Sequence, residues 1–182
     1  DPLVILDAVL AFLCLCLVAS AVYIFNDLRD LEADRQHPRK RYRPMASGAM
    51  PTRHAPLMIA TLIIVGLSVA VSVGMPFTFV LCIYLLLTTA YSVRLKRYVV
   101  LDILLLASLY TLRVISGGAA TGIPLSMWLI AFSIFFFLSL AAVKRQAELV
   151  DGRSRNEAST AGRGYVTLDV DIISQMAVSA GY

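Results

Sequence analysis

Long apolar runs separated by short polar segments make up most of the chain. Each complete run is close to the about 20 residues with which a helix crosses a hydrocarbon layer of about 30 Å. Helices are expected, because backbone polar groups in lipid must be satisfied within the segment. The pattern predicts an all-α, multispanning transmembrane helix bundle, with five full spans and the start of a sixth. The predicted spans cover residues 3–25, 55–73, 77–93, 99–119 and 125–143, and the sixth begins near residue 168.

Composition supports this interpretation. The chain is 59% hydrophobic and only 15% charged, with a mean hydropathy of +0.78, which is too apolar for a soluble domain. It begins at Asp1 without a methionine and ends at Tyr182 inside an apolar pattern. We therefore expect one membrane domain over residues 1–182 that is incomplete at both ends.

The basic residues are concentrated in three of the polar segments. Of the 16 Lys and Arg residues, seven lie in 26–53, three in 94–97 and five in 144–167, while Arg113 lies within a span. The intervening Gly/Pro turns carry none. Alternating spans place the three basic loops on one side of the membrane, and the positive-inside rule predicts that this side is cytoplasmic.

An acidic cluster follows the first apolar run. If the helix continues beyond the run, Asp27, Asp30 and Asp34 fall at positions i, i+3 and i+7 and share an arc of roughly 60°. Three carboxylates on one face repel each other, and at the mouth of a membrane helix they normally require a cation. Oxygen ligands favour Mg²⁺, which is usually shared with substrate phosphates. The alternative is a solvated, charged helix end.

Basic side chains follow the acidic cluster closely. Lys40 and Arg43 lie in a loop that Pro38 and Pro44 stiffen, and they could supply counter-charge to a diphosphate. A purely topogenic signal is the alternative. Lys96, in the next basic loop, opens onto the same side, although a snorkelling lysine would explain it equally well.

The third basic loop begins with a mixed-charge face. On a continuing helix Lys144, Glu148 and Asp151 share one face, and Arg145 lies about 100° away. The two carboxylates could hold a second metal ion, or the face could be an ordinary ion pair at a helix end. Lys144 and Arg145 could instead meet an anionic second substrate.

The fourth span contains two charged residues, Asp102 and Arg113, about 16 Å apart along a helix. Charges at this depth usually face a polar cavity, and a buried ion pair to another span is the alternative. A transporter or channel would use the two as a relay. Tyr84, Tyr91 and Tyr110 are expected in the core or along an apolar tunnel.

Two motifs carry a resemblance to a known family. The sequence Asn26-Asp27-x-x-Asp30-x-x-x-Asp34, followed by His37-Pro38-x-Lys40-x-x-Arg43-Pro44, resembles the first signature of the UbiA superfamily of intramembrane prenyltransferases. Tyr91-Ser92-x-x-Leu95-Lys96 matches a further element of that family. The resemblance covers essentially the whole chain, and it implies the central part of a roughly nine-helix bundle.

The resemblance also implies chemistry. A polyprenyl diphosphate would lie in a lateral cavity, with its diphosphate on Mg²⁺ held by Asp27, Asp30 and Asp34 and with Asn26 in the same motif. The prenyl group would then pass to a small acceptor. The expected location is a bacterial inner membrane, with the bilayer as partner, active-site loops in the cytoplasm and no nucleic acid bound.

The second family signature is altered here. Many members carry a second aspartate-rich motif where this chain has Lys144-Arg145-x-x-Glu148. That stretch resembles polyprenyl-phosphate phosphoribosyltransferases and, together with Arg163-Gly164-Tyr165, bacterial members that carry a preceding haloacid-dehalogenase-type domain. Prenyl transfer is the first expectation. The alternative is transfer from phosphoribosyl diphosphate to a polyprenyl phosphate, in which the lipid phosphate is the nucleophile.

Overall fold

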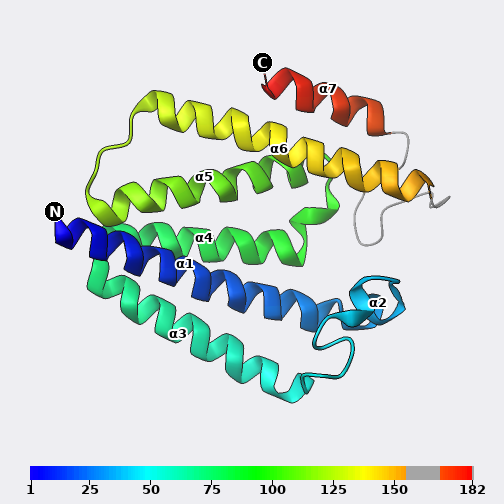
Figure 1. Ribbon diagram of the computed structural model, residues 1–182, viewed down its shortest axis with the longest axis horizontal. Helices are drawn as coiled ribbons and strands as arrows, with labels where there is room; N and C mark the ends of the chain where they lie inside the picture. The colour runs from blue at the N-terminus through cyan, green and yellow to red at the C-terminus, as the bar shows by residue number, and fades with distance from the viewer. Residues whose placement is uncertain (155–168, 182) are drawn as a thin grey trace. The chain divides into compact units, whose positions relative to one another are not determined.

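The computed structural model describes residues 1–154 and 169–181, which form helices and no strands (Figure 1). The chain divides into two compact units, Asp1–Leu85 and Leu86–Tyr182. Helix α4 (Met75–Val93) runs across the division. Each unit is described by itself below.

The first unit is organised around two long helices that pack side by side, α1 and α3 (Figure 1). The segment between them contains only short helices and turns, and it lies at the end where α1 stops. The elements are α1 (Pro2–Arg29), α2 (Leu31–Gln36), η1 (Lys40–Tyr42), η2 (Thr52–His54) and α3 (Ala55–Val73).

A glycine allows α1 and α3 to approach closely. A Cβ atom added at Gly66 would lie 3.3 Å from Cγ2 of Val18 and 3.5 Å from Cβ of Leu17. Val18 is fully buried, so it has little room to give way. The missing side chain at Gly66 therefore sets the distance between the two helices.

Replacing Gly66 with valine is expected to push α1 away from α3. Overpacking of this kind costs about 1–3 kcal/mol, which corresponds to a drop in Tm of about 5 °C for a chain of this size. Thermal unfolding in detergent measures the effect. Gly117→Val is the matched control, because a Cβ atom at Gly117 meets nothing within 4 Å. An equal drop in both variants would contradict this account of the packing.

The second unit packs α5 against α6, and α6 against α7. Its core combines large side chains with alanines that let the helices approach, namely Ile103, Leu149, Ile173, Ala141, Ala142 and Ala177. The elements are η3 (Leu95–Arg97), α5 (Leu101–Thr121), α6 (Met127–Ser154) and α7 (Val170–Gly181).

The structure confirms the predicted spans and corrects some of their ends. Within the described residues, five helices are long and apolar enough to cross a membrane. Helix α1 continues beyond the apolar run to Arg29, and α6 continues to Ser154. Both extensions are polar, and helices need not end at an apolar boundary when residues such as Lys, Arg and Glu follow. Helix α7, where the sixth span was predicted to start, begins at Val170, slightly later than predicted.

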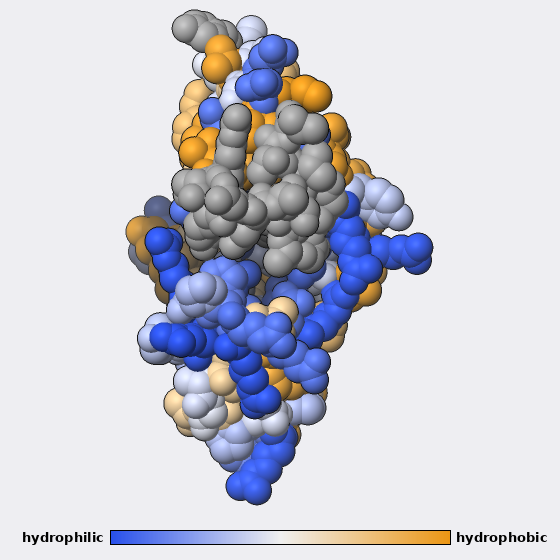
Figure 2. Space-filling model, turned by 90° about the vertical axis from the view of Figure 1, so that its right-hand side faces the viewer, coloured by the Kyte–Doolittle hydropathy of each residue, from blue (hydrophilic) through white to orange (hydrophobic). Residues whose placement is uncertain are grey.

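Large apolar side chains on the long helices face outward. Trp128 is 86% exposed, Leu57 72% and Phe12 64%. Surfaces of this kind are stable in lipid and not in water. By contrast, hydrophilic side chains dominate the lower half of Figure 2, which looks onto the end of the first unit that carries α2. The protein is therefore an integral membrane protein, and its first unit has a polar end.

Candidate functional site

The acidic cluster lies where α1 gives way to α2. Asn26 and Asp27 occupy the last turn of α1, and Asp34 lies on α2. The prediction of one continuous helical face was wrong at Asp30, which separates the two helices with φ −95° and ψ 12°. Aspartate favours helix starts over helix interiors, which suits a residue that ends one helix and begins the next.

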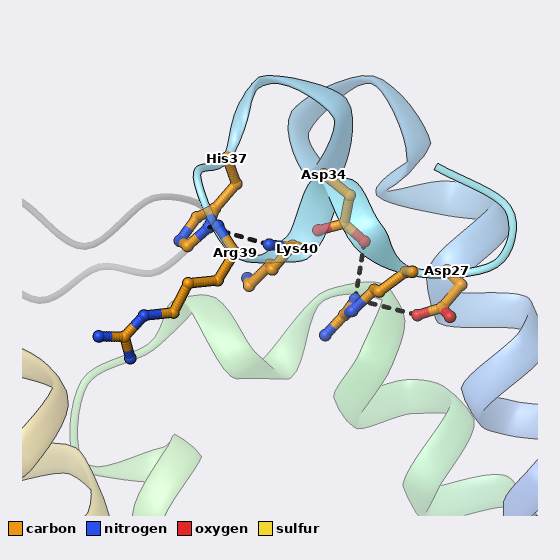
Figure 3. A network of polar contacts seen from close by, with 6 residues as sticks. Asp27, Asp34, His37, Arg39 and Lys40 are labelled. Carbon is orange, nitrogen blue, oxygen red and sulfur yellow. Dashed lines mark hydrogen bonds and ion pairs between the residues drawn. The ribbon is translucent and has the colours of Figure 1, made fainter. Parts of the chain in front are cut away.

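Arg43 brings two of the predicted carboxylates together across the break. Its Nη1 lies 2.9 Å from Oδ1 of Asp27 and 2.7 Å from Oδ2 of Asp34, as the dashed lines in Figure 3 show. Asp34 is buried, whereas the Arg43 side chain is 40% exposed. The guanidinium therefore bridges α1 and α2 from the polar side of the site.

His37 shapes the loop that carries Arg43. Its Nδ1 accepts hydrogen bonds from the backbone N–H groups of Arg39, at 3.2 Å, and Lys40, at 3.3 Å (Figure 3). The N–H of Arg43 then donates to the carbonyl oxygen of Lys40 at 2.9 Å. From the sequence, His37 was identified only as part of the family motif, and this role was missed. His37 fixes the turn from which Arg43 reaches the carboxylates.

The donor set of the acidic cluster fits Mg²⁺. It offers only oxygen atoms, which this ion prefers. Oδ1 of Asn26 is buried and has no hydrogen-bond partner within residues 1–154 and 169–181, so one oxygen atom that could bind a metal ion is unsatisfied. Among the described residues, no group of three or more Asp, Glu, His or Cys side chains is arranged so that it could hold a metal ion. Asp27 and Asp34 instead share the positive charge of Arg43.

Replacing Arg43 with glutamine is expected to make the fold more sensitive to Mg²⁺. Without the guanidinium, Asp27 and Asp34 lose their shared counter-charge. Because Arg43 is substantially exposed, we expect a loss of only about 1 kcal/mol, or about 3 °C in Tm, in metal-free buffer. Added Mg²⁺ should restore Tm in the variant more than it raises Tm in the wild type.

The matched control for this prediction is Arg41→Gln in the same loop. Arg41 donates a hydrogen bond to the hydroxyl of Tyr42 at 2.7 Å, and its guanidinium lies 4.9 Å from the centre of that ring. Its replacement should leave the response to Mg²⁺ unchanged. Equal Mg²⁺ responses in wild type and Arg43→Gln would show that Arg43 does not compensate the carboxylates.

The second unit contains a separate buried polar network. Oδ1 of Asp102 accepts hydrogen bonds from the hydroxyl of Tyr91, at 2.7 Å, and from Nη2 of Arg145, at 3.3 Å. Nε of Arg145 lies 2.5 Å from Oδ2 of Asp102 in an ion pair, and its Nη1 pairs with Glu148. Of the two environments considered for Asp102, the structure confirms a buried ion pair to another span.

The remaining predicted residues have diverse surroundings. Lys40 is exposed on η1, and Lys96 is half-buried in η3. Lys144 and Asp151 are exposed on α6, whereas Arg145 is turned into the protein. The segment 163–165 lies outside the described residues.

The sequence did not reveal that Tyr91, Asp102 and Arg145 form one network. An aspartate in the first turn of an apolar helix signalled that a partner was needed, and Arg145 was an available cation. The missing information was the register of α5 against α6, since the two charged residues lie 43 positions apart.

Comparisons with known proteins agree with this architecture. Residues 2–162 match the model of the UbiA prenyltransferase family. A decaprenyl-phosphate phosphoribosyltransferase from Corynebacterium glutamicum is 41% identical over 148 residues, which are 80% of this chain and 45% of that protein. The nodulation protein NoeC from Azorhizobium caulinodans is 38% identical over 95% of this chain and 56% of its own length.

The fold also matches that of a solved protein. The structure of a UbiA homologue from Archaeoglobus fulgidus, bound to GPP and Mg²⁺, superposes with a TM-score of 0.81 at 17% identity, over 96% of this chain and 62% of that one. The chain thus spans about half the length of the curated relatives and somewhat more of the solved structure. The match of the family model over most of its length shows that this chain belongs to the UbiA prenyltransferase family.

Proposed function

We propose that the protein is a Mg²⁺-dependent membrane transferase that moves a phosphoribosyl group from its diphosphate to a polyprenyl phosphate. The observation that carries the proposal is the pairing of Asp27 and Asp34 through Arg43 at the polar end of an apolar helix. The choice of substrates is supported by the relative from Corynebacterium glutamicum, whose name specifies decaprenyl phosphate and phosphoribosyl transfer.

The acidic cluster suits the diphosphate leaving group. Asp27, Asp30 and Asp34, with Oδ1 of Asn26, would hold Mg²⁺. When bound, the ion would supply Lewis-acid charge that stabilises the departing diphosphate. Arg43 lies beside these carboxylates, and its guanidinium could donate hydrogen bonds to the phosphate oxygens of the substrate. Lys40, exposed on the same turn, would add a second positive charge.

The chemistry balances without a redox partner. The bond between the anomeric carbon of the ribose and the diphosphate oxygen breaks, and the diphosphate keeps the electron pair. A phosphate oxygen of the polyprenyl phosphate forms the new bond to that carbon. On this proposal the carboxylates face the cytoplasm, because the basic loops are predicted to lie there.

Prenyl transfer to a small acceptor is the second candidate, and the description of the matching family favours it. The same carboxylates would then hold the prenyl diphosphate, and its allylic carbon–oxygen bond would break. Family membership favours either transferase over the transporter or channel alternative.

The decisive assay uses the full-length protein in lipid with Mg²⁺. Diphosphate release is followed in parallel from phosphoribosyl diphosphate with a polyprenyl phosphate, and from geranylgeranyl diphosphate with candidate acceptors. Release only in the phosphoribosyl reaction, together with a ribosylated lipid product, supports the proposal. Release only from the prenyl diphosphate would replace it with prenyl transfer, and release in neither reaction would contradict both.

A further inference from the structure

The buried network of the second unit indicates that neighbouring residues of α6 have different roles. We propose that Arg145 is a positioning residue that holds the Glu148 carboxylate at the polar end of α6 and does not itself contact substrate. Asp102 fixes Arg145, and Tyr91 fixes Asp102. The inference rests on the proposed transferase function and adds to it a role for Glu148, whose carboxylate would accept hydrogen bonds from a substrate hydroxyl group.

The contacts of Arg145 leave it poorly placed to bind a ligand. Its side chain is 1% exposed, and that of Asp102 is fully buried. Nη2 donates a hydrogen bond to Oδ1 of Asp102, and Nε lies 2.5 Å from Oδ2 in an ion pair, so two of its nitrogens approach the same buried carboxylate. If Arg145 turned toward a ligand, it would leave a buried negative charge without its partner, and that is strongly unfavourable.

Glu148 is the member of the network that reaches the polar surroundings. Its side chain is 32% exposed, and Oε2 pairs with Nη1 of Arg145 at a spacing of i, i+3. Because the ion pair with Asp102 holds Arg145 in place, the contact with Arg145 also limits the orientations of the Glu148 carboxylate. A flexible glutamate would otherwise sample several rotamers.

Packing on either side keeps the network in register. Leu149, next to Glu148, is buried in the same apolar cluster as Ile103, which is next to Asp102. The hydroxyl of Tyr91 then fixes the Asp102 carboxylate at 2.7 Å. The positions of α5 and α6 are thus set by apolar packing and by the ion pair together, which is the arrangement expected of a support for a neighbouring functional group.

Lys144 offers a contrast one position earlier. It is exposed on α6, so it remains available to a phosphate group. On this view Lys144 contacts the second substrate, and Arg145 acts through Glu148. Lys144→Gln is expected to raise KM more than it lowers kcat, whereas changes at Arg145 are expected to lower kcat more than they raise KM.

The test uses the double variant Asp102→Leu/Arg145→Met in the full-length protein. Replacing a buried ion pair by apolar residues of similar size often leaves stability unchanged. Because Tyr91 and Glu148 lose their partners, we expect a Tm within about 5 °C of the wild type, but a kcat that is lower by about 10- to 100-fold, as is typical when the support of a functional group is removed. A stable double variant with wild-type kcat would overturn the inference.

Two further measurements keep the outcome clear. Arg145→Lys retains the charge beside Asp102 but loses the fork that also reaches Glu148, so it should lower kcat even if the double variant fails to fold. The second measurement is the thermal unfolding of Glu148→Gln, which does not depend on enzymatic activity. Because the pair is partly exposed, this change should lower Tm by only about 2 °C in the wild type. It should lower Tm by much less in the double variant, which no longer contains Arg145.

These outcomes separate the two proposals. No transfer by the wild type in either donor assay would contradict the proposed function. Equal effects of Glu148→Gln on Tm in both backgrounds would show that Arg145 does not hold Glu148, whatever reaction the protein performs. Wild-type kcat in folded Arg145→Lys would also overturn the positioning role.

Discussion

Replacing Asp27 with asparagine is expected to lower the transfer rate by at least about 10²-fold in the full-length protein. The carboxylate would hold the Mg²⁺ ion that neutralises the leaving diphosphate, and losing one such electrostatic contact typically costs 10²–10³-fold in rate. Asparagine keeps the shape and one oxygen but loses the charge. Asp34→Asn should act in the same direction, because Arg43 places its carboxylate beside that of Asp27.

Asp7→Asn is the matched control for Asp27→Asn. Both residues lie on α1, but 20 positions apart, about 30 Å along the helix axis. The rate with Asp7→Asn should stay within about twofold of the wild type, because Asp7 is half-buried near the other end of the helix and lies far from the acidic cluster. Measurements should use saturating Mg²⁺ and donor, with Tm determined in parallel. A folded Asp27→Asn protein with wild-type rates would rule out the proposed role of the acidic cluster.

The spans and the acidic cluster could be predicted because their signals are local. An apolar run of sufficient length predicts a membrane helix whatever the rest of the chain does. Asp27 and Asp34 were predicted to lie together from helical spacing alone. Their proximity survives the break at Asp30, since a single residue interrupts the helix and Arg43 bridges the two carboxylates.

The second unit shows what local patterns cannot predict. Arg145 was predicted, together with Lys144, to meet an anionic second substrate. Its actual direction depends on which side of α6 faces α5, and the weakly one-sided apolar pattern of this helix does not settle that. His37 was missed for a related reason. A ring nitrogen that accepts two backbone hydrogen bonds leaves no spacing pattern in the sequence.

Replacing Asp102 alone with asparagine is expected to cause the largest loss of stability. The change removes the buried negative charge but leaves the Arg145 guanidinium, which is 1% exposed. Breaking a buried pair in this way typically costs about 3–5 kcal/mol. Glu148 still contacts Arg145, so we expect a value near the lower limit, or a drop in Tm of about 10 °C. Thermal unfolding in detergent measures it.

Asp171→Asn provides a closely matched control. Asp171 is the second residue of α7, as Asp102 is the second residue of α5, so the two substitutions change the interaction with a helix N-terminus in the same way. Asp171 is exposed, and its replacement should shift Tm by about 2 °C or less. The difference between the two variants therefore isolates the buried pair. If Asp102→Asn were as mild as Asp171→Asn, Arg145 would have to find water or another acceptor, and α6 would not depend on Asp102 for its register.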